Sequence, residues 1–369
     1  MTNDAHILII GGGPAGLAAA IAARNRGFSV AVADACRPPI EKPCGEGLLP
    51  GGVAALRSLG VELSSACAFP FRAIRFSDEQ SSASAPIPHG SGFGLPRTVL
   101  HRKLIARAAA AGVDLLWGSR VTLLGGQRVA VDGSAFDCKW VVGADGRNSG
   151  VAAWAGLAPR RSARPRFGFR RHFAVTPWSD AVEVHWGQRV QVVVTPTGSS
   201  SVCVVAFTGH PGLRLDDAIP QFPELATRLR GVQPMDSERG DQTSAVRLRA
   251  VTRGGVALVG DAAGPVDALT GNGLSLAFQQ GLLLADAFER DDLRHYDSAH
   301  RLLMHTPARM SRLLVTLASS AHIRRRALRL FARRPDRFLW VLSVHTGPIP
   351  ETSISTGEIL SLGWRVLRA

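Results

Sequence analysis

The sequence predicts a mixed α/β protein in which a parallel sheet of strand–helix–strand units is interleaved with an antiparallel sheet and followed by a helical segment. Three observations carry this prediction. The apolar run at residues 6–10 precedes a glycine-rich turn and an alanine-rich stretch, the pattern of a buried parallel strand leading into a helix. Residues 160–250 alternate strand-like runs with Gly, Pro and Ser turns, which is typical of an antiparallel sheet. At residue 256 the chain returns to an apolar strand, a glycine-rich turn and helical patterning.

The composition is that of an ordinary globular protein with an unusual charge. The chain has 369 residues, 46% of them hydrophobic and 20% charged, which suits two closely joined domains. The formal net charge of +14 comes from arginine, since only three of the 43 basic residues are lysines. The heavy use of Arg, Ala and Gly suggests that the positive charge reflects the nucleotide composition of the genome rather than a binding function. No basic patch is interleaved with aromatic residues, so nucleic-acid binding is not expected.

Cysteine spacing and apolar runs bear on metal binding and location. The five cysteines are scattered without a CxxC pair, so neither a zinc site nor a disulfide framework is predicted. The N-terminal stretch lacks the basic region and cleavage site of a signal peptide. No apolar run reaches the roughly 18 residues of a membrane span. We therefore expect a cytoplasmic protein without a bound metal.

The first strand leads into a dinucleotide fingerprint. Gly11, Gly13 and Gly16 have the GxGxxG spacing, and an alanine-rich helix over about 17–26 follows. The first glycine permits the tight turn, the second lets the backbone approach a pyrophosphate, and the third lets the helix pack on the strand. The second strand ends at Asp34, whose carboxylate can accept hydrogen bonds from ribose hydroxyls. Together these features predict a dinucleotide site.

The middle of the chain is expected to add helices, a small meander and the antiparallel sheet. A glycine-rich loop at 41–50 precedes a short helix, and Arg97 opens a longer helix that Gly112 stops. A turn signal at residues 132–133 divides the meander, and the strand after it runs into a second glycine-acid motif at 143–146. The predicted boundaries are 52–59 and 97–111 for helices, 113–117, 121–124, 128–131, 135–139 and 140–142 for strands, and 170–175, 181–186, 190–194 and 201–207 for the antiparallel sheet.

A third motif lies late in the chain. An apolar strand at 256–259 is followed by Gly260 and Asp261, a glycine-rich turn as far as Gly273, and a helix over 274–286. An acidic residue at a strand end, close to a helix N-terminus, is suited to holding a polar cofactor.

The order of the three glycine-acid motifs resembles the flavoprotein monooxygenase superfamily typified by p-hydroxybenzoate hydroxylase. It is similar also to the geranylgeranyl reductase and flavin-dependent halogenase branches. The resemblance covers about residues 5–300 and implies FAD, bound in a Rossmann-like domain that is interleaved with a substrate-binding β-sheet domain. The implied boundaries are 1–75, 97–160 and 251–300 for the FAD domain, 76–96 and 161–250 for the sheet domain, and 301–369 for the C-terminal helical region.

The resemblance also implies cofactor contacts, residue by residue. Asp34 would bind the adenosine ribose, and the backbone of Val121 would meet the adenine. Asp145 would lie near the pyrophosphate, and Asp261 would bind the ribityl chain. Arg97 matches the family arginine near the flavin. The implied cofactor-binding residues are Gly11, Gly13, Ala15, Gly16, Asp34, Ala35, Gly45, Arg97, Val121, Asp145, Asp261, Gly271, Asn272, Gly273 and Leu274.

The Gly271-Asn272-Gly273 turn would face the pyrimidine edge of the isoalloxazine. Reduced flavin carries negative charge there, and a helix N-terminus offers unpaired N–H groups with a partial charge of about +0.5. That charge would stabilise the anionic reduced flavin. Glycines are needed because side chains would block the approach of the ring.

The chain combines features of several branches. The loop at 44–48, Cys-Gly-Glu-Gly-Leu, resembles the geranylgeranyl reductases and halogenases, in which this loop lies against the flavin ring. The halogenase WxWxIP signature and the aromatic motif of the geranylgeranyl reductases are missing, and residues 192–198 are closer to hydroxylase-like members. Ala268 stands where the family usually has a proline beside the flavin.

Few side chains are candidates for chemistry. Cys44 either faces the isoalloxazine or substrate, or is a small buried cysteine that supports a turn. Glu46 is a surface acid, an acid at a helix start or a proton donor, and we favour the helix start. His172 and His185 lie on predicted strands where a histidine could assist deprotonation of a phenol, although ordinary sheet histidines are commoner. Arg170 and the arginine after it could bind an anionic substrate, but solvated strand arginines are commoner.

The resemblance implies an FAD-dependent oxidoreductase. We expect a monooxygenase that takes electrons from NADH or NADPH and uses O₂ on a hydrophobic or aromatic secondary metabolite. In such enzymes the protein mainly positions the ring and excludes water. Two alternatives stay open: a reductase or dehydrogenase acting on carbon–carbon bonds, like the geranylgeranyl reductases, and a flavin-holding protein without turnover.

The C-terminal region is apolar and basic. From residue 301 onward, 12 arginines stand against three acidic residues. The stretches 313–317, 323–331 and 338–342 suit basic amphipathic helices that contact an anionic membrane or an acidic carrier protein. They equally suit helices that cap the FAD domain with their arginines outward, and we favour this capping.

Overall fold

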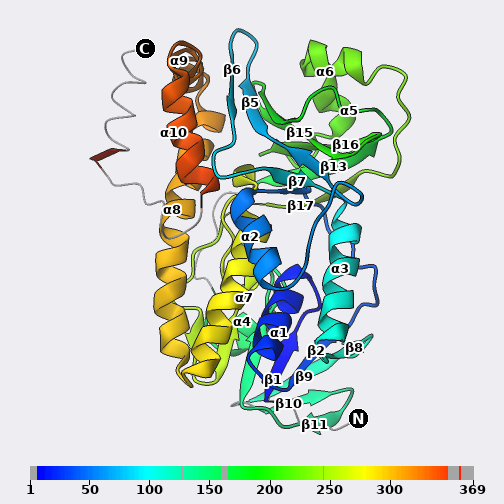
Figure 1. Ribbon diagram of the computed structural model, residues 1–369, viewed down its shortest axis with the longest axis vertical. Coiled ribbons are helices and arrows are strands. Elements are labelled where there is room, and N and C mark those ends of the chain that lie inside the picture. The colour runs from blue at the N-terminus through cyan, green and yellow to red at the C-terminus, as the bar shows by residue number, and fades with distance from the viewer. Residues whose placement is uncertain (1–5, 126–127, 159–164, 244, 348–356, 359–369) are drawn as a thin grey trace.

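The computed structural model describes residues 6–125, 128–158, 165–243, 245–347 and 357–358. Figure 1 shows a parallel sheet with its helices in the lower half of the molecule, a large sheet in the upper half, and the C-terminal helices along one side. The predicted combination of a parallel sheet, an antiparallel sheet and a helical C-terminal segment is confirmed. The predicted C-terminal region reaches residue 369, and its stretches 348–356 and 359–369 lie outside the described residues.

The parallel sheet brings the three glycine-acid motifs to one edge. Its strand order is β18-β19-β12-β1-β2-β8, and only the edge strand β18 is antiparallel to its neighbour. In the register, Ile10 pairs with both Ala33 and Gly143, so three strands end side by side. The bounds are β1 (Ile7–Ile10), β2 (Val30–Asp34), β8 (Asp114–Trp117), β12 (Trp140–Gly143), β18 (Thr252–Arg253) and β19 (Val256–Leu258).

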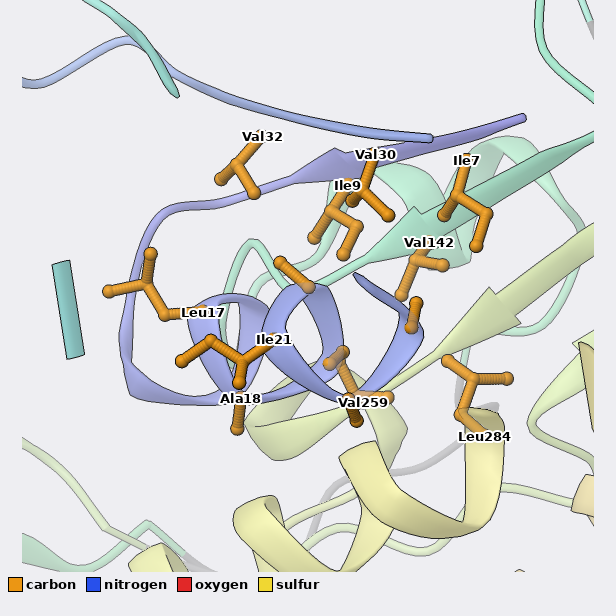
Figure 2. Packing of buried hydrophobic residues seen from close by; sticks show 14 of the residues in the cluster. Ile7, Ile9, Leu17, Ala18, Ile21, Val30, Val32, Val142, Val259 and Leu284 are labelled. Carbon is orange, nitrogen blue, oxygen red and sulfur yellow. The ribbon is translucent and has the colours of Figure 1, made fainter. Parts of the chain in front are cut away.

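Two helices with small residues pack closely against this sheet. α1 (Pro14–Asn25) begins with proline at its first turn, where the missing N–H costs nothing. It crosses α7 (Gly273–Glu289) so closely that a β-carbon at Gly281 would lie 2.9 Å from the backbone nitrogen of Ala19. Figure 2 shows Leu17 of α1 and the strand residues forming this fully buried core. The core fixes the glycine turns at the sheet edge.

The larger sheet has seven strands in the order β17-β13-β16-β15-β14-β5-β6. It is antiparallel as predicted, except that β14 and β5 pair in parallel. One face is covered by α5 (Leu215–Ala218) and α6 (Pro223–Arg228). The bounds of the strands are β5 (Ala73–Ser77), β6 (Ser82–Pro86), β13 (Phe167–Phe173), β14 (Ala181–Trp186), β15 (Val190–Gly198), β16 (Ser201–Thr208) and β17 (Arg239–Gln242).

The C-terminal helices cover the other face of that sheet. They are α8 (Leu293–Ser319), α9 (Ala321–Arg333) and α10 (Pro335–Thr346). α8 packs on α7, while α9 and α10 pack on β6, so the segment caps both sheets rather than the nucleotide-binding half alone. The rings of Phe76 and Phe338 lie 5.0 Å apart within this core. Within the described residues, no helix has the length and apolarity needed to cross a membrane.

Short elements complete the described fold. A small sheet has the order β11-β10-β9, and another has the order β3-β7-β4. The predicted turn before α7 contains two short 3₁₀ helices, η2 and η3. The bounds are β3 (Gly47–Leu48), β4 (Phe69–Phe71), β7 (Gly92–Gly94), β9 (Val121–Gly125), β10 (Arg128–Val131), β11 (Ser134–Phe136), α2 (Pro50–Ser58), α3 (Arg97–Ala110), α4 (Gly150–Trp154), η1 (Ile219–Gln221), η2 (Gly260–Ala263) and η3 (Ala268–Thr270).

Candidate functional site

A cavity of about 610 Å³ lies between the carboxyl edge of the parallel sheet and the inner face of the large sheet. Most of the residues expected at the cofactor or the substrate line it. Those that do are Gly11, Gly13, Ala15, Asp34, Cys44, Gly45, Arg97, Asp145, Asp261, Gly271, Gly273 and Leu274. Those that do not are Gly16, Ala35, Val121, Asn272, His172 and His185.

The first glycine turn is shaped to receive a ligand. Gly11 has a φ of +113°, which disfavours any other residue. A β-carbon at Gly13 would meet no atom within 4 Å, so the turn leaves room on the cavity side. The buried ring of His101 donates a 2.8 Å hydrogen bond from Nε2 to the carbonyl oxygen of Gly12. Burial lowers the pKa of His101, so this support is a neutral ring.

Asp34 is fixed at the end of β2. Its Oδ2 accepts the Gly12 N–H at 2.7 Å, and its Oδ1 accepts the Cys36 N–H at 2.8 Å. Each carboxylate oxygen has a second lone pair, so the oriented group can still accept ribose hydroxyls.

Asp145 braces the second motif in a similar way. It accepts a 2.6 Å hydrogen bond from the Ser149 hydroxyl and a 3.1 Å bond from the Val151 N–H. These bonds tie the turn after β12 to the first turn of α4, where a carboxylate is favoured.

Asp261 forms an ion pair that sequence reasoning did not anticipate. Lys42 Nζ lies 2.7 Å from Asp261 Oδ2 and 3.7 Å from Asp241 Oδ2. All three side chains are partly exposed and line the cavity. The lysine therefore adds a positive charge to the cavity wall where the third motif begins. Lys42 belongs to the loop before Cys44, and its closeness to Cys44 was the only feature of the sequence that could have indicated a place at the cavity.

The start of α7 opens onto the cavity. Gly271 has a φ of +62°, and neither it nor Gly273 would place a β-carbon within 4 Å of another atom. Asn272 is the N-cap residue but makes no side-chain capping bond, and it is buried beside the cavity rather than lining it. Arg97 also lines the cavity, and its buried Nε has no hydrogen-bond partner among the described residues. An uncapped helix start and a guanidinium make this end of the cavity electropositive.

These walls fit a flavin dinucleotide. The glycine turn with Asp34 suits the nucleotide end, and the electropositive start of α7 suits the pyrimidine edge of the ring. The model of the FAD binding domain family matches residues 4–290. The chain belongs to this family. The predicted FAD-dependent oxidoreductase is therefore confirmed at the level of the family, which covers monooxygenases and reductases.

Relatives of this flavoprotein include both kinds of enzyme. It is 28% identical over 352 residues to menaquinone reductase of Mycolicibacterium smegmatis, with 86% of each chain covered. It is 25% identical over 354 residues to a Bacillus subtilis protein provisionally named an FAD-dependent monooxygenase, with 88% of this chain and 94% of that protein covered. Its fold matches a flavoprotein/dehydrogenase from Cytophaga hutchinsonii with a TM-score of 0.84, 18% identity and 99% of both chains covered.

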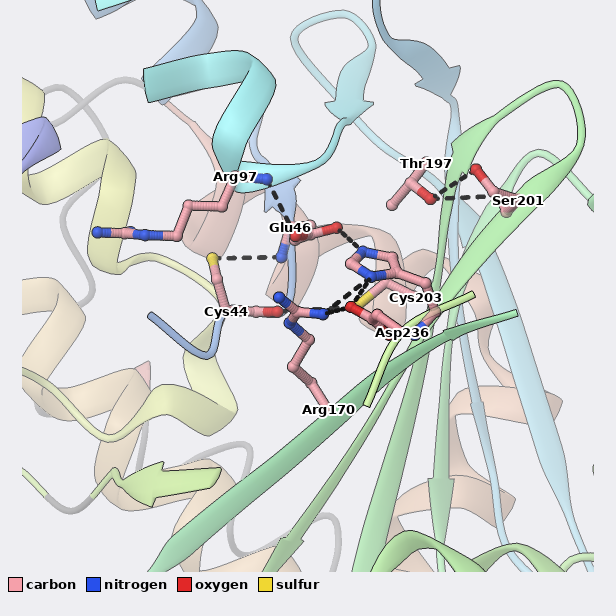
Figure 3. Close-up of polar contacts among 9 residues, drawn as sticks. Cys44, Glu46, Arg97, Arg170, Thr197, Ser201, Cys203 and Asp236 are labelled. Carbon is pink, nitrogen blue, oxygen red and sulfur yellow. Dashed lines mark hydrogen bonds and ion pairs between the residues drawn. The ribbon is translucent and has the colours of Figure 1, made fainter. Parts of the chain in front are cut away.

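A buried polar cluster lies where the Cys44–Glu46 loop of the flavoprotein meets the large sheet. Figure 3 shows Glu46, Asp236 and Arg170 converging there. His172 connects the two acids: its Nε2 lies 2.5 Å from Glu46 Oε2, and its Nδ1 lies 2.9 Å from Asp236 Oδ2. Arg170 is ion-paired with Asp236. His172 itself does not line the cavity, but its partner Glu46 does.

Glu46 lies both at the start of a helix and on the cavity wall. Its Oε1 accepts the N–H of Arg97, the first residue of α3, at 2.9 Å, so it is an acid at a helix start. It is also a cavity residue with a side chain only 1% exposed, so the surface interpretation is wrong. Glu46 has a φ of +58°, a strained backbone conformation for a residue other than glycine.

Cys44 lines the cavity as a thiol. Its Sγ accepts the N–H of Glu46 at 3.3 Å. Burial raises its pKa, although the charge of Arg97 opposes the shift. The structure thus combines both interpretations of Cys44, since the residue supports the turn and borders the cavity. Because the thiol stays protonated near neutral pH, it is not a ready nucleophile.

His185 does not face the cavity. On β14, Val182 and Val184 line the cavity, so the alternating residues Glu183 and His185 point to the opposite face. There His185 Nδ1 is 2.9 Å from the Ser77 hydroxyl and its Nε2 is 3.2 Å from Glu183 Oε2. The strand register thus turns His185 away from the cavity, as for an ordinary sheet histidine, and gives no support to a role in deprotonating a phenol.

Val121, Ala35 and Gly16 also lie off the cavity wall. Val121 begins β9 of the small meander, and Ala35 follows Asp34 out of the sheet. Gly16 sits inside the helix–strand contact, where a β-carbon would lie 1.9 Å from the carbonyl oxygen of Gly11. Gly16 therefore permits packing, as expected from the fingerprint, while the cofactor contacts of the other two residues stay predictions.

The far half of the cavity is an apolar chamber. One wall is the inner face of the large sheet, and the other consists of α8, α10 and η3. Ala268, at the usual proline position, lies on this wall. The chamber residues are Ile74, Phe76, Val182, Val184, Val193, Val205, Phe207, Leu269, Met310, Leu314, Val341 and Leu342.

His345 of α10 is a polar cavity residue that sequence reasoning missed. It lines the cavity, and its Nε2 donates a 2.8 Å hydrogen bond to the carbonyl oxygen of Thr270 in η3. This bond ties the C-terminal helices to the turn before α7. No local pattern in the sequence could have indicated it, because the partners are 75 residues apart.

Proposed function

We propose that this flavoprotein is a monooxygenase that uses O₂ and electrons from NADH or NADPH to hydroxylate a long, apolar, electron-rich substrate. The observation that carries the proposal is the continuity of the cavity. The glycine-lined half of the cavity fits FAD. The same cavity continues into a chamber lined by valine, leucine and phenylalanine side chains. Such a chamber suits an alkyl chain or an aromatic ring and excludes water from the reacting centre.

The chain's own residues would hold and orient the partners of the reaction. Bound FAD would supply two-electron redox chemistry. The start of α7 at Gly273 would stabilise negative charge at the pyrimidine edge, and Arg97 would add to that field. The inner sheet face, with Val193 and Phe207, would position the substrate against the cofactor half of the cavity.

A substrate panel tests this proposal. We expect the protein purified with FAD to oxidise NADH or NADPH faster when alkylphenols of increasing chain length are added. With ¹⁸O₂, the hydroxylated product is expected to carry one labelled oxygen atom. A protein that takes up no FAD, or one that forms the same product without O₂, contradicts the proposal.

The second candidate is a reductase of carbon–carbon double bonds. Two observations favour it: the 28% identity to menaquinone reductase, and the Glu46–His172 pair at the cavity, because carbon reduction needs a proton donor. Isoprenoid quinones in the same panel separate the candidates. A product that forms anaerobically with one double bond fewer would establish the reductase.

We also propose a cytoplasmic location and an outward-facing basic surface on α9 for an anionic membrane or an acidic carrier protein. Arg329 and Arg333 of α9 are exposed, while Leu328 and Phe331 point into the core. A helix with this division of residues can contact an anionic surface without unpacking.

A further inference from the structure

The Glu46–His172–Asp236 cluster connects solvent with the cavity. Exposure of the side chains changes in steps along it: Asp236 is 30% exposed, His172 is 12% exposed and Glu46 is 1% exposed. Asp236 lies at the solvent end, and Glu46 lines the cavity. Each contact between neighbours is within hydrogen-bonding distance, at 2.9 Å and 2.5 Å. The three groups therefore form an unbroken chain from solvent to the wall of the cavity.

The imidazole has a partner in either protonation state. As an imidazolium, His172 donates from Nε2 to Glu46 and from Nδ1 to Asp236. As a neutral ring with hydrogen on Nε2, it can accept at Nδ1 from the guanidinium of Arg170, which lies 2.9 Å away. A ring that is satisfied with and without the second proton is suited to passing protons on.

Charges around the ring favour a proton over a metal ion. Two carboxylates, Glu46 and Asp236, face His172, and buried Arg170 supplies one balancing positive charge. Cys203 lies beside them, and its donor atom lies within 4.8 Å of those of Glu46 and His172. The guanidinium against the same carboxylates disfavours a second fixed cation, and burial keeps the Cys203 thiol protonated by raising its pKa.

We propose that Asp236, His172 and Glu46 form a proton path between solvent and the flavin cavity. The path rests on the proposed flavin-dependent function but not on whether that function is hydroxylation or reduction, since both exchange protons with solvent. Glu46 is its cavity end, while His172 and Asp236 are positioning residues that act through Glu46.

The transfer makes and breaks only O–H and N–H bonds. The imidazolium gives its Nε2 proton to Glu46, which passes a proton to an acceptor in the cavity. Rotation of the neutral ring about its Cβ–Cγ bond then turns the remaining N–H toward Glu46, and the nitrogen now facing Asp236 takes a proton that arrives from solvent through Asp236. One proton leaves solvent for each one delivered, and no electron is transferred along the path. In the opposite direction the same steps remove a substrate proton.

Reoxidation of the reduced holoenzyme tests the path without a known substrate. The FAD-loaded protein is photoreduced without O₂ and mixed with aerated buffer between pH 5 and pH 9. Reoxidation takes up protons as O₂ becomes H₂O₂. We expect His172→Gln and Asp236→Asn to bind FAD like the parent but to reoxidise about a hundredfold more slowly, the low end of general acid–base effects. The parent is expected to react more slowly in D₂O, and the variants to lose this difference.

Two further variants separate proton transfer from a structural role. His172→Ala should regain part of the rate when imidazole is added, because a small base can occupy the vacated space next to solvent. His185→Gln is the matched control, since it removes a buried histidine between a hydroxyl and a carboxylate on the opposite face of the same sheet. The reoxidation rate of His185→Gln should depend on pH as that of the parent does.

The proposal is overturned if His172→Gln and Asp236→Asn hold FAD and reoxidise with the parent's rate and pH profile. It is also overturned if His172→Ala is slow and imidazole restores nothing. A protein that reoxidises through the path but transfers no oxygen to any phenol contradicts only the proposed monooxygenase. The two failures are therefore distinguishable.

Discussion

A β-carbon at Gly16 would lie 1.9 Å from the carbonyl oxygen of Gly11. The two glycines stand at the start of α1 and at the end of β1, where helix and strand come together around the first turn. Gly11 holds that turn with a φ of +113°, and its own β-carbon would lie 2.3 Å from the Ala144 carbonyl oxygen. Backbone atoms crowd both positions, so neither contact can be relieved by moving a side chain.

Gly16→Ala is therefore expected to destabilise the fold. One added methyl group must displace α1 from β1, and overpacking of this kind costs about 1–3 kcal/mol, or more against backbone. Urea denaturation of the protein freed of FAD measures the free energy of unfolding. An unchanged free energy of unfolding would show that α1 can move away from β1 without cost, so that the close contact at Gly16 does not limit stability.

Gly13→Ala is the matched substitution with the opposite outcome. Gly13 has a φ of −72°, which alanine adopts, and its β-carbon would meet no protein atom within 4 Å. The methyl group would enter the space expected for the pyrophosphate. We expect the unfolding free energy of the apoprotein to change by less than about 0.5 kcal/mol. The dissociation constant for FAD should rise about tenfold or more, that is by about 1.4 kcal/mol. FAD titration followed by flavin fluorescence checks this, and parent-like affinity would contradict it.

The glycine-acid motifs could be predicted because they are local. Each motif combines an apolar strand, a glycine turn and an acid within one or two neighbouring elements of the sequence, and the parallel sheet brings all three motifs to one edge. The resemblance to flavoproteins then identified the cofactor, which the family match confirms.

The partners of His172 and the face of His185 could not be predicted. Both faces of the large sheet are covered, so alternation along β14 does not say which side meets the cavity. Asp236 lies in an irregular connection 64 residues from His172, and no pattern links the two. Such contacts depend on tertiary packing, which a single sequence does not display.

Val193→Trp should close the apolar chamber. Val193 lies on the inner face of β15 and lines the cavity, so an indole there would occupy space rather than displace core side chains. We expect FAD affinity to stay unchanged and the affinity for a fluorescent long-chain fatty acid to fall about tenfold, or by about 1.4 kcal/mol. Val193→Ala is the control and should bind the probe at least as well as the parent. Equal binding by all three proteins would place the apolar ligand elsewhere.

Neutralising the outer arginines of α9 should weaken binding to anionic lipid. Each exposed arginine near a membrane contributes about 1 kcal/mol, so Arg329→Gln with Arg333→Gln should lower partitioning by about 2 kcal/mol, roughly 30-fold. Sedimentation with phosphatidylglycerol vesicles measures this. Arg120→Gln with Arg128→Gln removes two exposed arginines beside and within the small meander and is expected to have little effect. If the parent does not bind the vesicles, the membrane proposal fails.

The stabilising effect of His172 should depend on pH. Burial alone would lower its pKa, but the hydrogen bonds and charges of Glu46 and Asp236 outweigh burial and raise it. The pKa of Asp236 is lowered, because bonds from His172 and the charge of Arg170 outweigh its burial. A raised histidine pKa adds stability that is complete below its ordinary value of about 6.5 and is lost as pH rises through the raised value.

The lowered pKa of Asp236 adds stability that is present above its ordinary carboxyl value and is lost on acidification. The difference in unfolding free energy between the parent and His172→Gln should therefore be greatest at about pH 5–6, near 3 kcal/mol for a partly buried ion pair. It should shrink steadily as the pH rises above about 7. Urea denaturation across that range provides the comparison, with His185→Gln as the control. A difference that stays constant from pH 5 to pH 9 would mean that the pKa of His172 is the same in the folded and the unfolded protein.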